Sequence, residues 1–193
     1  MEENKIKTAE NIVIIGGSAG SLDIILKIVP ALHQHLNAAI ILVLHRKSSS
    51  DTILVDLLSV KTKLIVKEAE EKESIVAGCI YIAPADYHLL IEKDRTFSLD
   101  VSEKVNYSRP SIDVTFESAS EVYGSHLTGI LLSGANADGT DGLEAIKQHN
   151  GICIAQEPST AEVAYMPQYA IDHLAIDHIL TAEQITDYIN SLV

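Results

Sequence analysis

Cysteine is scarce in this chain of 193 residues, which contains only Cys79 and Cys153. The two are far apart in sequence, and each lies in an apolar run typical of a strand. We therefore expect two reduced cysteines in the core and no disulfide, as is usual in the cytoplasm.

Basic residues are also few. Lysine and arginine total 14 against 27 acidic residues, so the formal net charge is −13. Because nucleic acids and anionic lipids attract positive surfaces, this balance argues against both as partners. Long apolar runs are absent too: none reaches the ~18 residues of a membrane span, and residues 1–10 lack the apolar segment of a signal peptide. The sequence predicts a cytoplasmic protein without membrane insertion.

What the chain does contain is a regular alternation of short apolar runs with segments of helical periodicity. Strands are expected at residues 12–15, 39–44, 63–66, 79–83, 127–132 and 152–155, and helices at 22–29, 51–58, 111–123, 143–148 and 182–192. Unbroken apolar strands separated by helices are typical of a mainly parallel sheet covered on both faces. We expect a doubly wound α/β fold, with an antiparallel hairpin of residues 88–92 and 96–101 at the edge. No linker divides the chain, so residues 1–193 are expected to form a single domain.

The first predicted strand leads into a glycine-rich turn of the form G-x-S-x-G, with Ser18 at its centre. The apolar stripe Leu22, Ile25, Leu26 and Val29 then predicts a helix. A serine between a strand and a helix exposes its hydroxyl next to unpaired N–H groups of the first helical turn. Acyl transfer needs both features, although a serine in such a turn more often caps a helix or binds phosphate.

Three strand ends carry residues of a hydrolytic kind: Ser18, His45 and Asp138. In parallel sheets, sites form beyond the carboxyl ends of the strands. The three residues can act as nucleophile, general base and the carboxylate that orients the base. Taken singly, His45 is typical of a surface histidine and Asp138 of a turn residue. Asp141 is a rival for the acid, although it is better placed to start the following helix.

The same interpretation assigns the groups around the nucleophile. The backbone N–H of Ala19 is the natural oxyanion donor, together with one from the turn at Gly134 and Ala135. Arg46 is near enough in sequence to help hold an acidic substrate.

Two other kinds of site fit less well. His33 and His35 suggest a metal, but no nearby cysteine or carboxylate completes a ligand set. The glycine-rich turn lacks G-x-G-x-x-G, because Ser18 replaces the second glycine, and no Walker loop is present. The sequence therefore predicts neither a metal nor a cofactor.

Six segments together resemble the catalytic domain of the chemotaxis methylesterases, the CheB family. They are residues 14–20, 44–45, 81–88, 109–114, 131–139 and 155–167, in this order along the chain. The resemblance implies a serine hydrolase with Ser18, His45 and Asp138 as its triad. Met166, in the last of these segments, is expected at the substrate together with Arg46. Three positions depart from the family pattern: Ala135 replaces a methionine, residues 46–48 replace a Met-Pro-Pro type of segment, and Ser108 replaces a histidine.

The resemblance also implies a function. Such enzymes remove methyl groups from glutamyl methyl esters in the cytoplasmic helices of chemoreceptors, releasing methanol, and can deamidate receptor glutamines. Family members usually carry an N-terminal receiver domain, whereas the first predicted strand begins near residue 12; a stand-alone form is therefore expected. Two alternatives remain: a catalytically weak receptor-binding or regulatory module of the same fold, and an esterase of small esters.

Overall fold

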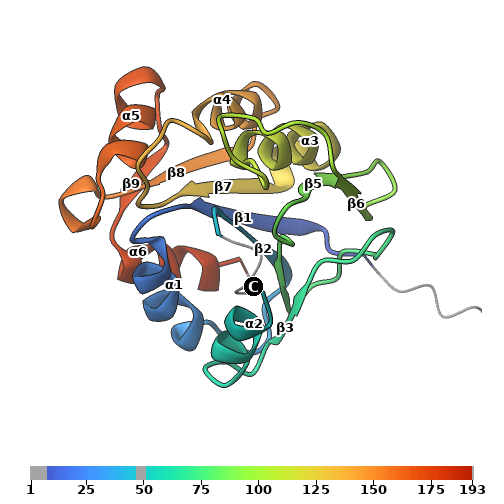
Figure 1. Ribbon diagram of the computed structural model, residues 1–193. Helices are drawn as coiled ribbons and strands as arrows, with labels where there is room; N and C mark the ends of the chain where they lie inside the picture. The colour runs from blue at the N-terminus through green and yellow to red at the C-terminus, as the bar shows by residue number, and fades with distance from the viewer. Residues whose placement is uncertain (1–7, 47–50, 193) are drawn as a thin grey trace, which may run out of the picture.

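The computed structural model describes residues 8–46 and 51–192. Lys47 and Ser48, which depart from the family pattern, lie outside these ranges. Seven parallel strands form one sheet in the order β3-β4-β2-β1-β7-β8-β9, and two further strands form a separate antiparallel pair (Figure 1). The predicted doubly wound α/β fold is confirmed.

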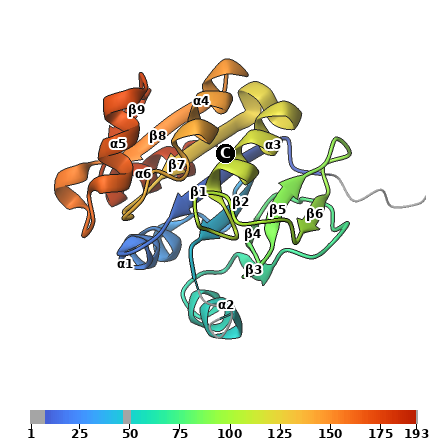
Figure 2. The same ribbon diagram turned by 45° about the horizontal axis from the view of Figure 1, so that its top comes forward.

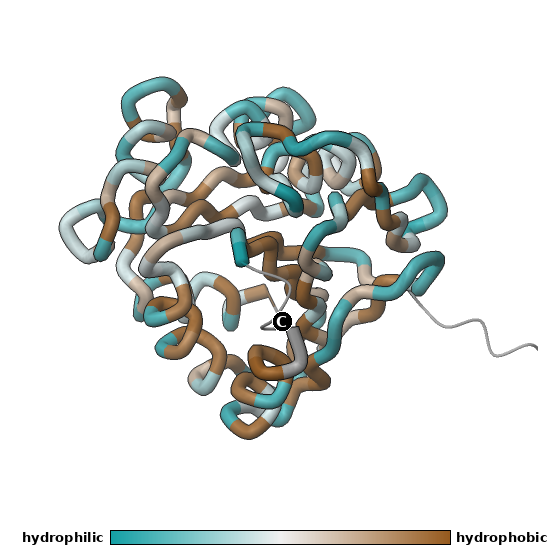
Figure 3. The backbone as a smooth tube through the Cα atoms, viewed as in Figure 1, coloured by the Kyte–Doolittle hydropathy of each residue, from teal (hydrophilic) through white to brown (hydrophobic). Residues whose placement is uncertain are grey.

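The main sheet is built from β1 (Asn11–Gly17), β2 (Ala38–Leu44), β3 (Ile65–Glu68), β4 (Cys79–Ile82), β7 (Leu127–Leu131), β8 (Ile152–Gln156) and β9 (His178–Leu180). The apolar runs become its central strands because both faces are covered: every residue of β2 and β7 is buried. Apolar segments accordingly run through the middle of the molecule in Figure 3. Both cysteines are buried and free, as expected.

Helices cover both faces of the sheet (Figure 2). The helices α1 (Ser21–Ile28), α2 (Asp51–Ser59) and α6 (Ala182–Asn190) pack with one core cluster. The other cluster contains α3 (Ile112–Tyr123), α4 (Thr140–Gln148) and α5 (Tyr165–His173). The hairpin of β5 (His88–Ile91) and β6 (Phe97–Asp100) packs on this second face, with α3 against β5. It was expected as an antiparallel pair, but it forms its own sheet instead of extending the edge of the main one.

Two details of the helices differ from expectation. In α1 the buried residues are Ser21, Ile24, Ile25 and Ile28, whereas Leu22 is 39% exposed. The buried stripe of α1 is therefore rotated relative to the predicted one. Leu22 does not pack in the core but lines a cavity at the end of the sheet. The helix α5 and the strand β9 had not been predicted.

The last helix begins with a capping box. Thr181 Oγ1 accepts from the N–H of Gln184, and Gln184 Oε1 accepts from the N–H of Thr181, at 3.4 and 3.0 Å. We expect Thr181→Ala to lower the free energy of unfolding by about 1 kcal/mol, since it leaves helical N–H groups without acceptors. Urea unfolding measures this loss. Gln184→Ala, which removes only the reciprocal bond, should cost less, and an equal or larger loss would contradict the explanation.

The described helices include none long and apolar enough to cross a membrane.

Candidate active site

The candidate site lies where the direction of the strand order changes. From β1 the chain passes to β2 on one side, and it later returns to β7 on the other. Loops that leave β1 and β7 therefore diverge at the carboxyl edge, which is where open parallel sheets bind ligands. Ser18 follows β1, His45 follows β2, and Asp138 follows β7.

The turn after β1 is held from the neighbouring loop. Ser18 donates its N–H to Ser133 O at 2.9 Å, and Ser133 Oγ donates to Ala19 O at 2.7 Å. Gln156, fully buried at the end of β8, accepts the N–H of Ser133 at 2.9 Å. The strands on either side thus fix the backbone on both sides of the Ser18 side chain.

Two glycines are required for this turn to form. Gly20 has φ +78°, a conformation that L side chains rarely adopt, and a Cβ there would lie 2.6 Å from the Cβ of Glu162. A Cβ on Gly17 would lie 2.5 Å from the Cβ of Ser21. Gly17 and Gly20 therefore allow close packing around Ser18.

His45 is fixed by a carboxylate. Its Nε2 lies 2.7 Å from Asp138 Oδ2, and its side chain is 12% exposed whereas that of Asp138 is fully buried. Asp138, and not the exposed Asp141, is therefore the acid that contacts the imidazole. Ser18 and His45 line one cavity of about 240 Å³, but no hydrogen bond joins these two described residues.

Asp138 also caps the N-terminus of α3. Its carboxylate accepts from the N–H groups of Ile112 and Asp113 at 2.7 and 3.1 Å and from Ser111 Oγ at 2.8 Å. Burial alone would raise the pKa of Asp138. The hydrogen bonds from His45, Ile112 and Asp113 outweigh burial and lower this pKa to about 2. Asp138 is therefore an anion that only accepts hydrogen bonds from its partners, so His45 Nε2 carries the hydrogen between them.

A second buried carboxyl group, that of Asp113, supports the loop that carries Asp138. Asp113 accepts from the N–H groups of Gly139 and Gly142, which begin α4, and from Asn106 Nδ2. Burial and the negative charge of Asp138 raise the pKa of Asp113 to about 8. Asp113 thus fixes the loop that carries Asp138, a role that sequence reasoning missed although Asp113 belongs to one of the recognised motifs.

The proposed oxyanion donors have different surroundings. Ala19 and Ala135 are both exposed, and within the described chain neither N–H has a recorded acceptor. Gly134, by contrast, donates its N–H to Val163 O at 3.0 Å. Of the two donors considered in that turn, only Ala135 is therefore available.

Of the two expected substrate-binding residues, Arg46 lines the cavity and Met166 does not. Met166 is fully buried and packs under the turn, so that a Cβ on Gly134 would lie 2.5 Å from its Cε. This buried position does not support a direct contact between Met166 and the substrate. Arg46 lines the cavity, but its Nη2 donates to Glu68 Oε1 at 2.7 Å and to Ala83 O at 3.1 Å. Its charge is therefore largely balanced by Glu68.

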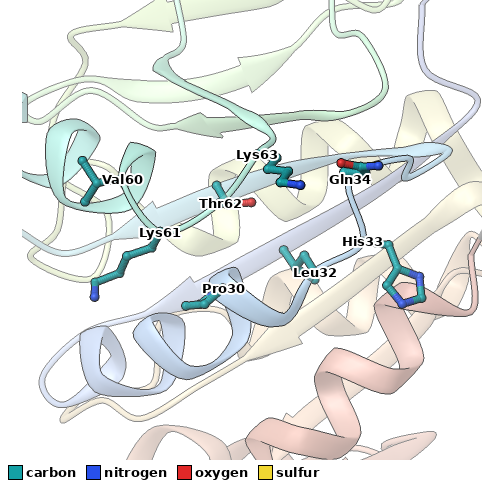
Figure 4. A pocket seen from close by; sticks show the side chains of 8 residues that line it. All are labelled: Pro30, Leu32, His33, Gln34, Val60, Lys61, Thr62 and Lys63. Atoms are coloured by element: carbon teal, nitrogen blue, oxygen red, sulfur yellow. The ribbon is translucent and has the colours of Figure 1, made fainter.

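The cavity beside Ser18 and His45 is mainly apolar. Its remaining lining includes the side chains of Leu22, Leu44, Ile53, Leu54 and Leu57. A larger hollow of about 480 Å³ lies elsewhere, between the residues before β2 and those before β3 (Figure 4). It includes His33, Lys61 and Lys63 but neither a serine nor a carboxylate, so it lacks the Ser-His-Asp set of residues.

The comparisons with known proteins agree with this geometry. The model of the family described as CheB methylesterase matches residues 13–189. A Leptospira interrogans protein described as a protein-glutamate methylesterase/protein-glutamine glutaminase is 46% identical over 175 residues, which cover 91% of each chain. A Thermotoga maritima protein of the same description is 35% identical, and the match covers 94% of this chain but 54% of that protein. The crystal structure of the Thermotoga maritima CheB methylesterase catalytic domain superposes with a TM-score of 0.91 at 35% identity, covering 95% of this chain and 98% of that one. The chain belongs to the CheB methylesterase family.

Proposed function

We propose that this protein is a serine hydrolase that removes methyl groups from glutamyl methyl esters of chemoreceptors, and that it also deamidates receptor glutamines. Membership of the CheB family and the names of its relatives support this activity. The single observation that carries the mechanism is the 2.7 Å hydrogen bond between His45 and Asp138, beside a cavity that also contains Ser18.

The proposed reaction begins at the nitrogen of His45 that does not face Asp138. Because Nε2 carries the hydrogen shared with the carboxylate, Nδ1 is the free acceptor of the neutral ring. Nδ1 takes the proton of Ser18 Oγ as this oxygen bonds to the ester carbon. The tetrahedral intermediate then collapses, and the proton passes from Nδ1 to the departing methoxy oxygen, which leaves as methanol.

The second half of the reaction repeats these steps with water. Water attacks the acyl-serine, His45 takes its proton, and the carboxylic acid leaves while Ser18 recovers a hydrogen. Both tetrahedral intermediates carry an oxyanion, for which we assign the N–H groups of Ala19 and Ala135 as donors. Such donors stabilise the charge most when they are fixed in advance, and the bonds from Ser133 hold the Ala19 turn in this way.

The cavity offers a place for the ester group. Leu22, Leu44 and Ile53 provide an apolar wall next to Ser18, and a methyl group gains from burial by such surfaces. We assign this wall to the methoxy group, with the receptor helix outside the cavity. The receptor helices of this reaction lie in the cytoplasm, which is the location we propose. With a formal net charge of −13, the protein gains no electrostatic steering toward acidic helices.

The test combines turnover with covalent labelling of the unmodified protein. Incubation with methylated receptor from the same organism should release methanol, and a fluorophosphonate probe should modify Ser18, as located by peptide mass mapping. Turnover of small esters without any action on the methylated receptor would favour an esterase instead. Receptor binding without methanol release or labelling would favour a regulatory module, and labelling at another serine would refute the assignment of the nucleophile.

A further inference from the structure

A second serine, Ser108, lies beside the imidazole of His45, which the sequence did not predict. Ser108 Oγ lies 3.3 Å from two acceptors for its single hydrogen, His45 Nδ1 and Asn106 O. Since Nε2 of His45 is held by Asp138, Nδ1 is the nitrogen with a free lone pair, and a hydroxyl can donate to it. Ser108 therefore contacts the same atom that the proposed reaction needs as the proton acceptor.

The position of Ser108 depends on a strained turn. Val105 and Ser108 pair through two backbone hydrogen bonds of 3.2 and 2.8 Å, and the two residues between them, Asn106 and Tyr107, have φ values of +50° and +62°. A residue other than glycine in this region costs on the order of 1 kcal/mol. Such strain persists only where surrounding contacts impose it, so it points to a required geometry.

Those contacts come from the site itself. Asn106 Nδ2 donates to Asp113 Oδ2 at 2.8 Å and lies 3.5 Å from Asp138 Oδ1. The side chain of Tyr107 is 97% exposed, whereas Ser108 is only 8% exposed. The turn is thus tied to the two buried aspartates, and its one inward hydroxyl points to the imidazole.

We propose that Ser108 is a positioning residue, whose hydroxyl donates to Nδ1 of the neutral His45 and fixes the plane of the ring. This inference rests on the proposed function, because it assumes that His45 is the base. Asp138 alone holds only one atom of the imidazole, so the ring can still rotate about that hydrogen bond. Ser108 supplies the second point, so that Nδ1 faces the cavity until Ser18 replaces Ser108 as its donor. Ser108 itself is not among the residues that line the cavity beside Ser18.

The test is the pH dependence of kcat/KM for methanol release from methylated receptor. A donor to Nδ1 stabilises the neutral ring, so its loss makes protonation easier. In Ser108→Ala we expect the acidic limb of the profile to move to higher pH by about half a unit, as the loss of one hydrogen bond allows. At the optimum, kcat/KM should fall about 3- to 10-fold through loss of ring orientation. Ser108→Thr, which keeps a hydroxyl, should restore both properties.

Ser102→Ala is the matched control. Ser102 lies on the same connection between β6 and α3, is exposed, and binds Asp100 Oδ2 at 2.7 Å instead of the imidazole. Its profile should equal that of the wild type. An unchanged acidic limb in Ser108→Ala, or a shift to lower pH, would overturn the proposal, since the latter means that the hydroxyl accepts from a charged ring.

A second measurement does not depend on turnover. Nitrogen NMR of protein with 15N-labelled histidine reports whether Nδ1 of His45 accepts a hydrogen bond. The Nδ1 resonance should move in Ser108→Ala and stay in Ser102→Ala. If the wild type releases no methanol, the proposed function fails while this spectrum still decides the contact. If methanol release is normal and neither the spectrum nor the profile changes, only the role of Ser108 is refuted.

Discussion

Ser18→Ala is expected to reduce kcat for methanol release by at least about 10⁴-fold, because loss of the nucleophile in serine hydrolases leaves only the contribution of binding and the oxyanion donors. The fold should be unaffected. The side chain of Ser18 makes no hydrogen bond to any described residue, and its backbone N–H, which alanine retains, donates to Ser133. We expect the free energy of unfolding to change by less than about 0.5 kcal/mol. Activity and stability are therefore separable at this position.

The measurement is a methanol-release assay on equal amounts of folded protein, with urea unfolding of the same preparations. Ser191→Ala is the control, since Ser191 is an exposed residue at the end of α6 that donates to Tyr188 O. It should retain wild-type turnover. If Ser18→Ala keeps more than a few per cent of wild-type activity, Ser18 is not the nucleophile.

Asp138→Asn is expected to reduce both activity and stability. An amide in place of the carboxylate favours the wrong tautomer of His45, which costs about 10⁴-fold in kcat in a triad. Each carboxylate oxygen also accepts from a backbone N–H, Oδ2 from Ile112 and Oδ1 from Asp113. Whichever way the amide is oriented, its NH2 group faces a donor. We expect a loss of about 3 kcal/mol in the free energy of unfolding, the cost of unsatisfied donors to a buried charged group.

The pH dependence of this loss follows from the pKa of Asp138. At about 2 in the folded chain it lies below the ordinary value of 3.8, so ionisation stabilises the fold. This contribution is complete well above pH 4 and disappears as the pH falls from about 4 toward 2. The stability difference between wild type and Asp138→Asn should therefore shrink over that interval, as measured by urea unfolding at several pH values.

Asp141→Asn is the matched control for both measurements. Asp141 lies three residues further on, is exposed, and belongs to the first turn of α4. Its replacement should leave kcat near the wild-type value and cost less than about 1 kcal/mol. Equal losses of activity in the two variants would remove the distinction between the two aspartates.

Much of the fold could be predicted because the strongest signals are local. The apolar runs of β1, β2 and β7 are buried on both faces of the sheet. The capping box of α6 is specified by four consecutive residues that begin with Thr181. The strand β9 lacks such a signal, since two of its three residues are exposed at the edge of the sheet. The helix α5 has Pro167 in its first turn and a polar exposed side, which conceal its periodicity.

The candidate site could be predicted only in part, for a related reason. The positions of Ser18, His45 and Asp138 follow from the rule that sites form beyond parallel strands. The partners of these residues come from loops far away in the chain: Ser108 lies 63 residues from His45, and Ser133 lies 114 from Ala19. No local pattern specifies such contacts. Met166 was expected at the substrate but is fully buried, and Arg46 lines the cavity while bonded to Glu68. A sequence motif does not reveal which neighbours a side chain contacts.

The capping of α3 by Asp138 has an evolutionary consequence. A carboxylate that the fold requires is not readily substituted, even in a lineage that no longer needs catalytic activity. The hydroxyl of Ser18 is under no such structural constraint, because no described residue binds it. Descendants of this protein that abandon hydrolysis are therefore expected to lose the serine first and to keep the aspartate, so an intact aspartate in a relative is poor evidence of activity.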